Sequence, residues 1–353
     1  MKLIWRYVSL LFSLCICCYF ILKSMKSGSK ERAPFHGNTL LPDGHGLSEL
    51  TCRQRERIFG VQTRRLQACN TGHFSLPGME DCHAWLTCDD IDNNVHIKKP
   101  IGHGAVKRVY FAEWKGFKVA YCNLTTEVFR EDFRHGLKMI KLFQPYDHVV
   151  QLVGYCGDAM VLEYHPWHSA DNLNQILSRS ENEHLNTVLF RFILSINYVE
   201  IIHFLHTHPA GVHVMCDSND IVKTLSQFLI RSDFQLILSD LDALPRIDPE
   251  QENLIKCGHR QLFGNFVAPE QLWPYDDRDF DDDEMPGYDE KTDIWKIPSV
   301  VQFILGDVPG SDVLWFHLFK VHRRCREVDP RLRPNTQEIL DEYMQIYISL
   351  YSS

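Results

Sequence analysis

Two aspartates stand at the ends of a predicted β-hairpin near the middle of the chain. The hairpin consists of two apolar runs, residues 227–230 and 234–239, joined by a polar turn at residues 231–233. Asp217 lies in the loop that leads into the hairpin, and Asp240 lies at its exit. A carboxylate can accept the proton of a reacting hydroxyl or bind a hard cation, although a lone aspartate in a loop is more often a cap or a turn residue. The pair therefore marks a candidate site for chemistry.

Two glycines and a lysine form a second group of candidate residues. Gly102 and Gly104 lie at the turn of a predicted strand-turn-strand segment, residues 101–112, and Lys107 follows them. Glycines let backbone amides approach phosphate oxygens closely, and an ammonium group can pair with the same oxygens. A Gly-x-Gly turn alone is a weak signal, and the alternative for Lys107 is a solvated strand lysine.

The periodicity of apolar residues predicts the elements that must hold these groups. Strands are expected at residues 101–112, 117–124, 149–153 and 160–164. Helices are expected at residues 127–143, 172–177 and 185–205, the last of which leads to the central hairpin. A β-rich first part followed by a helical second part predicts an α+β fold with two lobes.

Composition sets limits on the function. The chain has 353 residues, enough for one large or two modest domains, and its net charge of −9 gives no electrostatic case for binding nucleic acid. An acidic run at residues 276–284 contributes to this charge. Such a run is usually a solvated loop, with an edge that faces a cation or a substrate as the alternative.

The N-terminal segment predicts a membrane anchor. Residues 7–22 carry no charge and are flanked by Lys2 and Arg6 on one side and by Lys23 and Lys26 on the other. The run is short for a spanning helix, but flanking lysines can extend to the membrane surface. No small-residue cleavage site follows, so a retained signal anchor is favoured over a cleaved signal peptide. Positive charge at both ends leaves the orientation open.

Cysteine usage indicates an oxidising compartment. Three of the twelve cysteines lie in the anchor, and Cys52, Cys69, Cys82 and Cys88 are grouped before the predicted two-lobed domain. Their spacings contain no Cys-x-x-Cys pair, so disulfides are favoured over a zinc site. The sequon at Asn123 lies in a predicted strand, which leaves its glycosylation open.

Together the anchor and the cysteines predict a single-pass type II membrane protein with a lumenal body. The expected parts are a cytoplasmic tail at residues 1–6, the anchor at 7–22, a lumenal stem at 23–50, a cysteine-bearing extension at 51–94 and the two-lobed domain at 95–347. A short helix is expected at residues 53–69 within the extension.

Several motifs occur in the order in which protein kinases carry them. Val-Ala-Pro-Glu at residues 267–270, Asp-Ile-Trp at 293–295 and Asp-Pro-Arg-Leu-Arg-Pro at 329–334 resemble the motifs that close the activation segment and organise the helical lobe of that family. The resemblance covers roughly residues 95–347. It implies a bilobal protein-kinase-like fold, the use of ATP with Mg²⁺ or Mn²⁺, and an ion pair between Glu270 and Arg333.

The same resemblance assigns roles to the candidate residues. It implies that Asp217 is the catalytic base, that Asp240 is the main metal ligand in an Asp-Leu-Asp version of the Asp-Phe-Gly motif, and that Gln227 replaces the metal-binding asparagine. The nucleotide-binding residues that it implies are Ile101, Gly102, Gly104, Val109, Ala120 and Glu163.

The chain also departs from the family pattern. The lysine usually found on the third strand is replaced by Cys122, while Lys107 stands in place of the third glycine of the loop. This exchange is similar to that of the with-no-lysine kinases and implies a catalytic role for Lys107. The helix glutamate that should pair with the lysine is not evident: Glu131 is the nearest glutamate, whereas direct alignment reaches Gly136.

The catalytic His-Arg-Asp is Met-Cys-Asp at residues 215–217, and its cysteine is expected to form a disulfide with Cys257. With these departures the chain most closely resembles the protein O-mannose kinases. That resemblance implies ATP-dependent phosphorylation of the 6-hydroxyl of O-linked mannose, in the GalNAc-GlcNAc-mannose trisaccharide on α-dystroglycan, at the endoplasmic reticulum membrane. The alternatives are an inactive lumenal pseudokinase that acts as a scaffold or glycan-binding module, and a kinase acting on protein serine or threonine.

Overall fold

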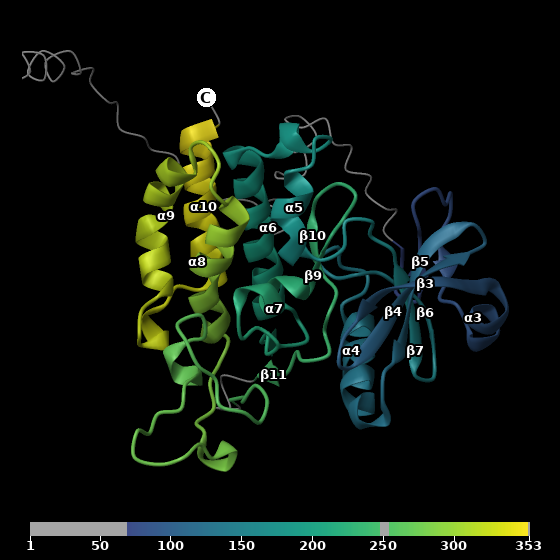
Figure 1. Cartoon of the computed structure of the whole chain (residues 1–353), viewed down its shortest axis with the longest axis horizontal. Coiled ribbons are helices and arrows are strands. Elements are labelled where there is room, and N and C mark those ends of the chain that lie inside the picture. The colour runs from purple at the N-terminus through teal and green to yellow at the C-terminus, as the bar shows by residue number, and fades with distance from the viewer. Residues whose placement is uncertain (1–68, 248–253, 352–353) are drawn as a thin grey trace, which may run out of the picture. The chain divides into compact units, whose positions relative to one another are not determined.

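The computed structural model describes residues 69–247 and 254–351, which form a sheet-rich lobe followed by a helical lobe (Figure 1). The strands are β1 (His73–Phe74), β2 (His83–Ala84), β3 (Val95–His103), β4 (Lys107–Trp114), β5 (Phe117–Leu124), β6 (Leu152–Cys156), β7 (Ala159–Glu163), β8 (Val212–His213), β9 (Phe228–Ile230), β10 (Leu236–Leu238) and β11 (Arg246–Ile247). The α-helices are α3 (Cys88–Asn94), α4 (Arg130–Leu142), α5 (Leu173–Leu177), α6 (Val188–Thr207), α7 (Ile221–Ser226), α8 (Lys291–Leu305), α9 (Ser311–Cys325) and α10 (Thr336–Tyr351). Short 3₁₀ turns are η1 (Glu127–Phe129), η2 (Ala170–Asn172), η3 (Glu183–Leu185), η5 (Pro269–Gln271), η6 (Asp282–Glu284) and η7 (Pro330–Leu332). The order of elements confirms the predicted mixed fold with a sheet-rich part and a helical part.

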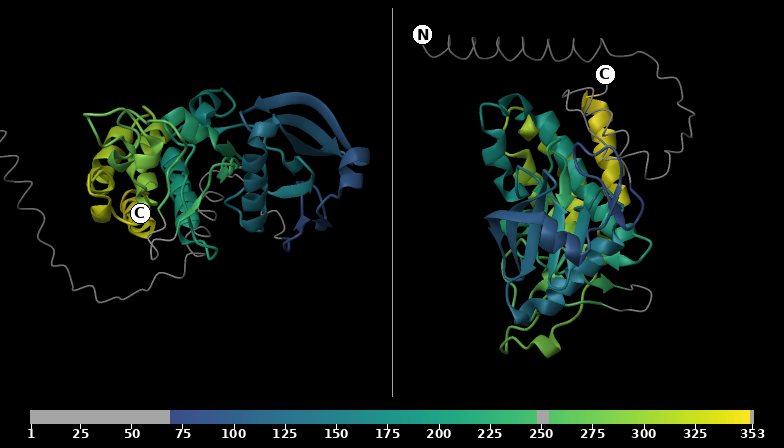
Figure 2. Two further views of the ribbon diagram at one scale, coloured as in Figure 1. Left: turned by 90° about the horizontal axis from the view of Figure 1, so that it is seen from below. Right: turned by 90° about the vertical axis from the view of Figure 1, so that its right-hand side faces the viewer.

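The first lobe is built on one antiparallel sheet of five strands in the order β3-β4-β5-β7-β6. Figure 2 shows this sheet with α4 alongside it. Strand β5 has the predicted bounds, while β6 and β7 lie within a few residues of theirs. The predicted helix at 127–143 is present as η1 followed by α4.

Residues 69–94 of the cysteine-bearing extension pack on this sheet. Their apolar side chains share one buried cluster with strands β3 to β7, formed by Phe74, Leu76, Leu86, Ile91, Val95, Ala112, Trp114, Val119, Val153 and Val161. A disulfide from Cys88 to Cys156 joins α3 to β6, and another links Cys69 to Cys82. Burial of this apolar area is the main force that holds the extension to the lobe. The predicted tail, anchor, stem and helix up to residue 68 lie outside the described residues.

The second lobe is organised around α6. Among the described residues, α6 is the helix that is long and apolar enough to cross a membrane, but most of it is buried, so it serves as the core helix of this lobe. Helices α8 and α10 pack against it. The expected ion pair is confirmed: the guanidinium of Arg333 donates to both carboxylate oxygens of Glu270, with Nη2 to Oε2 at 2.8 Å.

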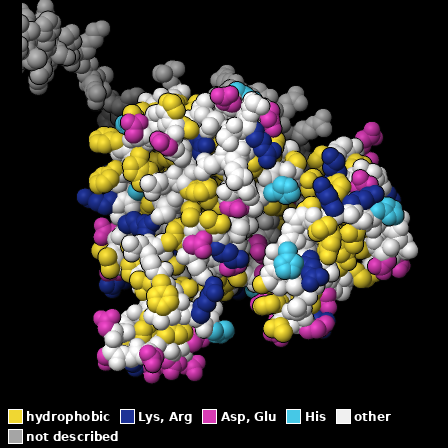
Figure 3. Space-filling view, viewed as in Figure 1, with side chains coloured by type: hydrophobic (Ala, Val, Ile, Leu, Met, Phe, Trp, Pro, Cys, Tyr) yellow, Lys and Arg dark blue, Asp and Glu magenta, His cyan; other side chains and the backbone are white. Residues whose placement is uncertain are grey.

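The central hairpin is confirmed as β9 paired antiparallel with β10. Its strands are short and buried, and residues 231–235 turn between them. The acidic run at 276–284 lies largely on the surface, and Figure 3 shows acidic side chains gathered at the lower end of the helical lobe, where this loop lies. Arg278 pairs with Glu284, and Asp282 pairs with Lys256 and His259, so part of this charge is neutralised within the protein.

Candidate active site

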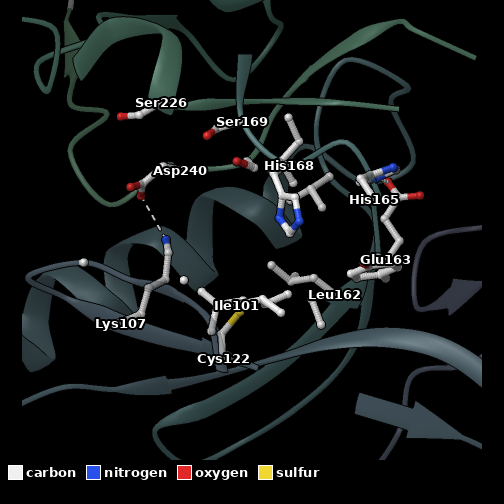
Figure 4. A pocket seen from close by; sticks show the side chains of 18 residues that line it. Ile101, Lys107, Cys122, Leu162, Glu163, His165, His168, Ser169, Ser226 and Asp240 are labelled. Carbon is white, nitrogen blue, oxygen red and sulfur yellow. Dashed lines mark hydrogen bonds and ion pairs between the residues drawn. The ribbon is translucent and has the colours of Figure 1, made fainter. Parts of the chain in front are cut away.

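One pocket between the two lobes collects most of the residues that the sequence singled out. It is lined from the sheet by all six residues expected to bind nucleotide, Ile101, Gly102, Gly104, Val109, Ala120 and Glu163, and also by Lys107 and Cys122. Asp240 enters it from the end of the hairpin (Figure 4). The pocket also takes in His165, His168, Ser169 and Ser226, which sequence reasoning missed because they carry no motif. The catalytic and binding roles of all these residues stay predictions.

The glycines of the β3–β4 turn fit a phosphate-bearing ligand. A Cβ atom on Gly102 would meet Val109 at 3.4 Å, and one on Gly104 would meet the Lys107 carbonyl oxygen at 3.6 Å, both ordinary contacts. Neither glycine has a positive φ. The packing of the protein therefore does not demand glycine at either position, which is compatible with the predicted approach of a phosphate to the backbone amides.

Lys107 is a buried residue, which rules out the solvated-strand alternative. It is 9% exposed, and its Nζ lies 2.9 Å from Asp240 Oδ1 (Figure 4). The same Nζ lies 2.9 Å from Asp242 Oδ2. Burial by itself would lower the pKa of the ammonium, but the charges of the two aspartates outweigh it and raise that pKa. Lys107 is thus a fixed positive charge beside the candidate metal ligand.

Strand register explains how a lysine on β4 can replace one on β5. Val109 lies directly opposite Cys122 in the antiparallel pair, so the two side chains point to the same face. Lys107 is two residues from Val109 on β4 and shares that face, which is the wall of the pocket. The Cys122 thiol remains in the apolar wall, where burial raises its pKa to about 12.

Asp242 is the partner of Lys107 that sequence reasoning missed. Glu131 on α4 is exposed, so the suggestion that it pairs with the lysine is wrong. The aligned position, Gly136, is buried against Asp242, and a Cβ atom there would lie 2.0 Å from Asp242 Oδ1. The missing side chain on α4 leaves room for a carboxylate that comes from the segment after β10 instead.

The two carboxylates beside Lys107 differ in their surroundings. Burial raises the pKa of Asp242 to about 7, the nearby charge of Asp240 adds to the rise, and the Lys107 ammonium opposes it. For Asp240, burial also acts to raise the pKa, but the Lys107 ammonium outweighs it and the pKa is lowered. Asp242 Oδ1 is buried without a hydrogen-bond partner among the described residues. Both carboxylates hold the Lys107 ammonium, but of the two only Asp240 is part of the pocket lining, so Asp240 is the one placed to meet a bound metal ion.

Asp217 lies outside the pocket lining, with 35% of its side chain exposed. Its Oδ2 is 2.6 Å from the Nζ of Lys223, which comes from α7. Helix α7 lies in the segment between Asp217 and the hairpin, and the Asp220 side chain caps it by accepting a hydrogen bond from the Lys223 amide. Sequence reasoning missed Lys223 because its distance along the chain from Asp217 gives no motif.

Gln227 also lies beside the pocket rather than in its lining. Its side-chain nitrogen donates a hydrogen bond to the Lys223 backbone carbonyl oxygen at 2.9 Å. Its backbone carbonyl oxygen accepts hydrogen bonds from the backbone amides of Ser239 and Asp240. These bonds tie Gln227 to the segment that carries Asp240. Its role as a metal ligand stays a prediction.

The expected disulfide between Cys216 and Cys257 is confirmed. It joins the residue before Asp217 to the segment that follows β11. The amide of Cys216 also donates to the Ala243 carbonyl oxygen at 3.1 Å. The loop that carries Asp217 is therefore attached to both segments that follow the hairpin, although it lacks the usual histidine and arginine.

Comparison with known proteins agrees with this geometry. Residues 134–261 match a family model described as the protein-kinase domain of FAM69. The chain is 48% identical over 285 residues to the protein O-mannose kinase of Homo sapiens, covering 80% of this chain and 81% of the human protein. It is 50% identical over 281 residues to that of Gallus gallus and 47% identical over 281 residues to that of Xenopus laevis, covering 79% of this chain in both cases and 79% and 80% of those proteins. At this identity and coverage, the chain belongs to the protein O-mannose kinase family and is a phosphotransferase that acts on an alcohol group.

Proposed function

We propose that the chain transfers the γ-phosphoryl group of ATP to the 6-hydroxyl of O-linked mannose in the GalNAc-GlcNAc-mannose trisaccharide of α-dystroglycan. Family membership supports the acceptor class. The observation that carries the proposal is the buried Lys107 ammonium, held 2.9 Å from both Asp240 and Asp242 at the wall of the nucleotide pocket. Burying a charge is costly, so this arrangement fits a site that must bind phosphate better than it fits an inert scaffold.

The residues around the pocket would each carry a different part of the reaction. A divalent metal ion, when bound, neutralises charge on the phosphate oxygens. Asp240 would hold that ion, with the amide oxygen of Gln227 as its second protein ligand. Lys107 and the backbone amides of the glycine turn would bind and orient the phosphates. Asp217, held by Lys223, would orient the mannose hydroxyl and accept its proton late, because a loose transition state needs little prior deprotonation.

The test is a transfer assay with the region from residue 51 to the C-terminus, ATP and either Mg²⁺ or Mn²⁺. The trisaccharide is expected to accept phosphate, while free mannose and a peptide pool accept little. Asp217→Asn should lower kcat roughly 10²- to 10⁴-fold, since it removes the proton acceptor, and Asp220→Asn, a change in the same loop, is the matched control. Phosphate on the peptide pool would favour the protein kinase alternative, and no transfer to any acceptor would favour the pseudokinase.

We further propose that the domain faces the lumen of the endoplasmic reticulum behind a type II anchor at residues 7–22. The three disulfides found among residues 69–247 and 254–351 support an oxidising compartment. Protein denatured and alkylated without reductant is then expected to be modified at Cys122 and Cys325 and to be protected at the bonded cysteines, as peptide mass mapping would show. Alkylation of both Cys216 and Cys257 before reduction would contradict this placement.

A further inference from the structure

A lysine is buried against the loop that carries Asp217, outside the lining of the pocket. Lys296 lies on α8 and is 2% exposed, and its Nζ donates to the hydroxyl of Ser218 at 2.6 Å. Ser218 is 1% exposed and follows Asp217 directly in the chain. An ammonium inside a protein loses its hydration, so a position of this kind is rarely occupied by lysine without a specific partner.

The hydroxyl of Ser218 connects Lys296 to the backbone of the loop by a second hydrogen bond. Its Oγ donates to the Met215 carbonyl oxygen at 2.6 Å while it accepts from Lys296, so the direction of both hydrogen bonds is set. The Ser218 amide donates to the Cys216 carbonyl oxygen at 2.7 Å. These bonds close a tight turn around Asp217, whose own side chain is directed to Lys223.

A second side chain of α8 reinforces the same turn. Asp293 lies one helical turn before Lys296, so the two side chains share a face of the helix. Its Oδ2 accepts the Met215 amide at 3.1 Å and lies 3.2 Å from His206 Nε2. The first turns of α8 therefore contact the residues on both sides of the pair Cys216 and Asp217.

We propose that Lys296 is a positioning residue for the proton acceptor: through Ser218 it fixes the turn that presents Asp217 to the sugar hydroxyl. The inference rests on the proposed function in giving Asp217 that role. It supplies a physical substitute for the histidine and arginine that this loop lacks, because the contacts of a buried ammonium and a disulfide together immobilise both neighbours of Asp217.

Positioning and mere structural support predict different results for Lys296→Met. Methionine has a similar length and no charge to bury, so the melting temperature is expected to stay the same or rise. The kcat for glycan phosphorylation is expected to fall roughly 10- to 100-fold, which is the effect of a small misplacement of a reacting group. The KM for ATP should change little, because Lys296 lies outside the pocket lining.

Ser218→Ala and the double variant test the route of the effect. Ser218→Ala removes only a hydroxyl and should lower kcat in the same way. The double variant is expected to be no worse than the worse single variant, because both changes break one chain of hydrogen bonds. Lys291→Met is the matched control, since this lysine lies on the same helix but donates to the carbonyl oxygens of Arg333 and Pro334.

Hydrogen exchange separates this inference from the proposed function. The amides of residues 216–218 are expected to exchange faster in Lys296→Met than in the wild type, with or without any acceptor. Normal exchange together with an unchanged kcat would overturn the inference, and so would single-variant losses that multiply in the double variant. A wild-type protein that fails to phosphorylate the trisaccharide would overturn the proposed function, while the exchange comparison would still decide the role of Lys296 in the loop.

Discussion

Lys107→Met is expected to abolish most phosphoryl transfer, with kcat lowered roughly 10²- to 10³-fold, the usual effect of removing one preorganised donor to a developing charge. The change deletes the ammonium that lies 2.9 Å from Asp240 and from Asp242, and it leaves two carboxylates side by side in a buried site. Loss of this positive charge should also lower the affinity for nucleotide, because the phosphates lose an oppositely charged partner in the pocket. Single-turnover transfer of labelled γ-phosphate and a nucleotide titration would measure the two effects.

A second lysine position gives this prediction a sharp control. Cys122 faces the same pocket from β5, at the site where the lysine stands in most protein kinases. Adding Cys122→Lys to Lys107→Met returns an ammonium to the pocket and is expected to restore part of the activity. Lys118→Met, which changes an exposed lysine of β5 outside the pocket lining, should leave the rate unchanged. Full activity of Lys107→Met would show that this lysine serves only the packing of the lobes.

Local pattern was enough to predict most elements of the fold. Strand β5 and the hairpin of β9 and β10 were predictable because apolar runs bounded by turn residues are local signals, which depend only on neighbouring positions in the chain. The strand predicted at 149–153 is displaced for a tertiary reason. The Val150 amide donates to the Leu238 carbonyl oxygen at 2.9 Å, so the start of this apolar run joins the hairpin of the other lobe, and the sheet strand begins only at Leu152.

The relocated lysine of the site was predictable because two departures from the kinase pattern compensate each other. The loss of lysine at Cys122 and its gain at Lys107 are both visible in the sequence, and together they favour a relocated ammonium. The partner of that ammonium was not predictable in the same way. Asp242 belongs to a motif position that normally holds glycine, and its contact with Lys107 depends on the space left by Gly136 on a helix more than a hundred residues earlier.

Gly136→Ala is therefore expected to impair the protein although alanine favours helices. In an ordinary helix this change would stabilise by about 1 kcal/mol. Here the new methyl group would lie 2.0 Å from Asp242 Oδ1 and 3.3 Å from its Cα, so Asp242 must move away from Lys107. We expect a net loss of about 1–3 kcal/mol in the free energy of unfolding, typical of overpacking. The rate should fall together with the stability, and a stabilised, fully active variant would contradict this account.

Exchanging the two side chains tests the pairing directly. Gly136→Glu alone places a larger side chain against Asp242, and Asp242→Gly alone leaves Lys107 paired only with Asp240, so both single variants should be poorly active. In the double variant the carboxylate comes from α4 and the space from position 242, so Lys107 regains two partners and transfer should recover well above either single variant. Lys138→Glu, on the exposed face of α4, controls for added negative charge. A double variant no more active than Gly136→Glu would contradict this expectation. It would mean that a carboxylate on α4 cannot replace Asp242, and that the segment after β10 must supply the carboxylate for Lys107 to keep its geometry relative to Asp240.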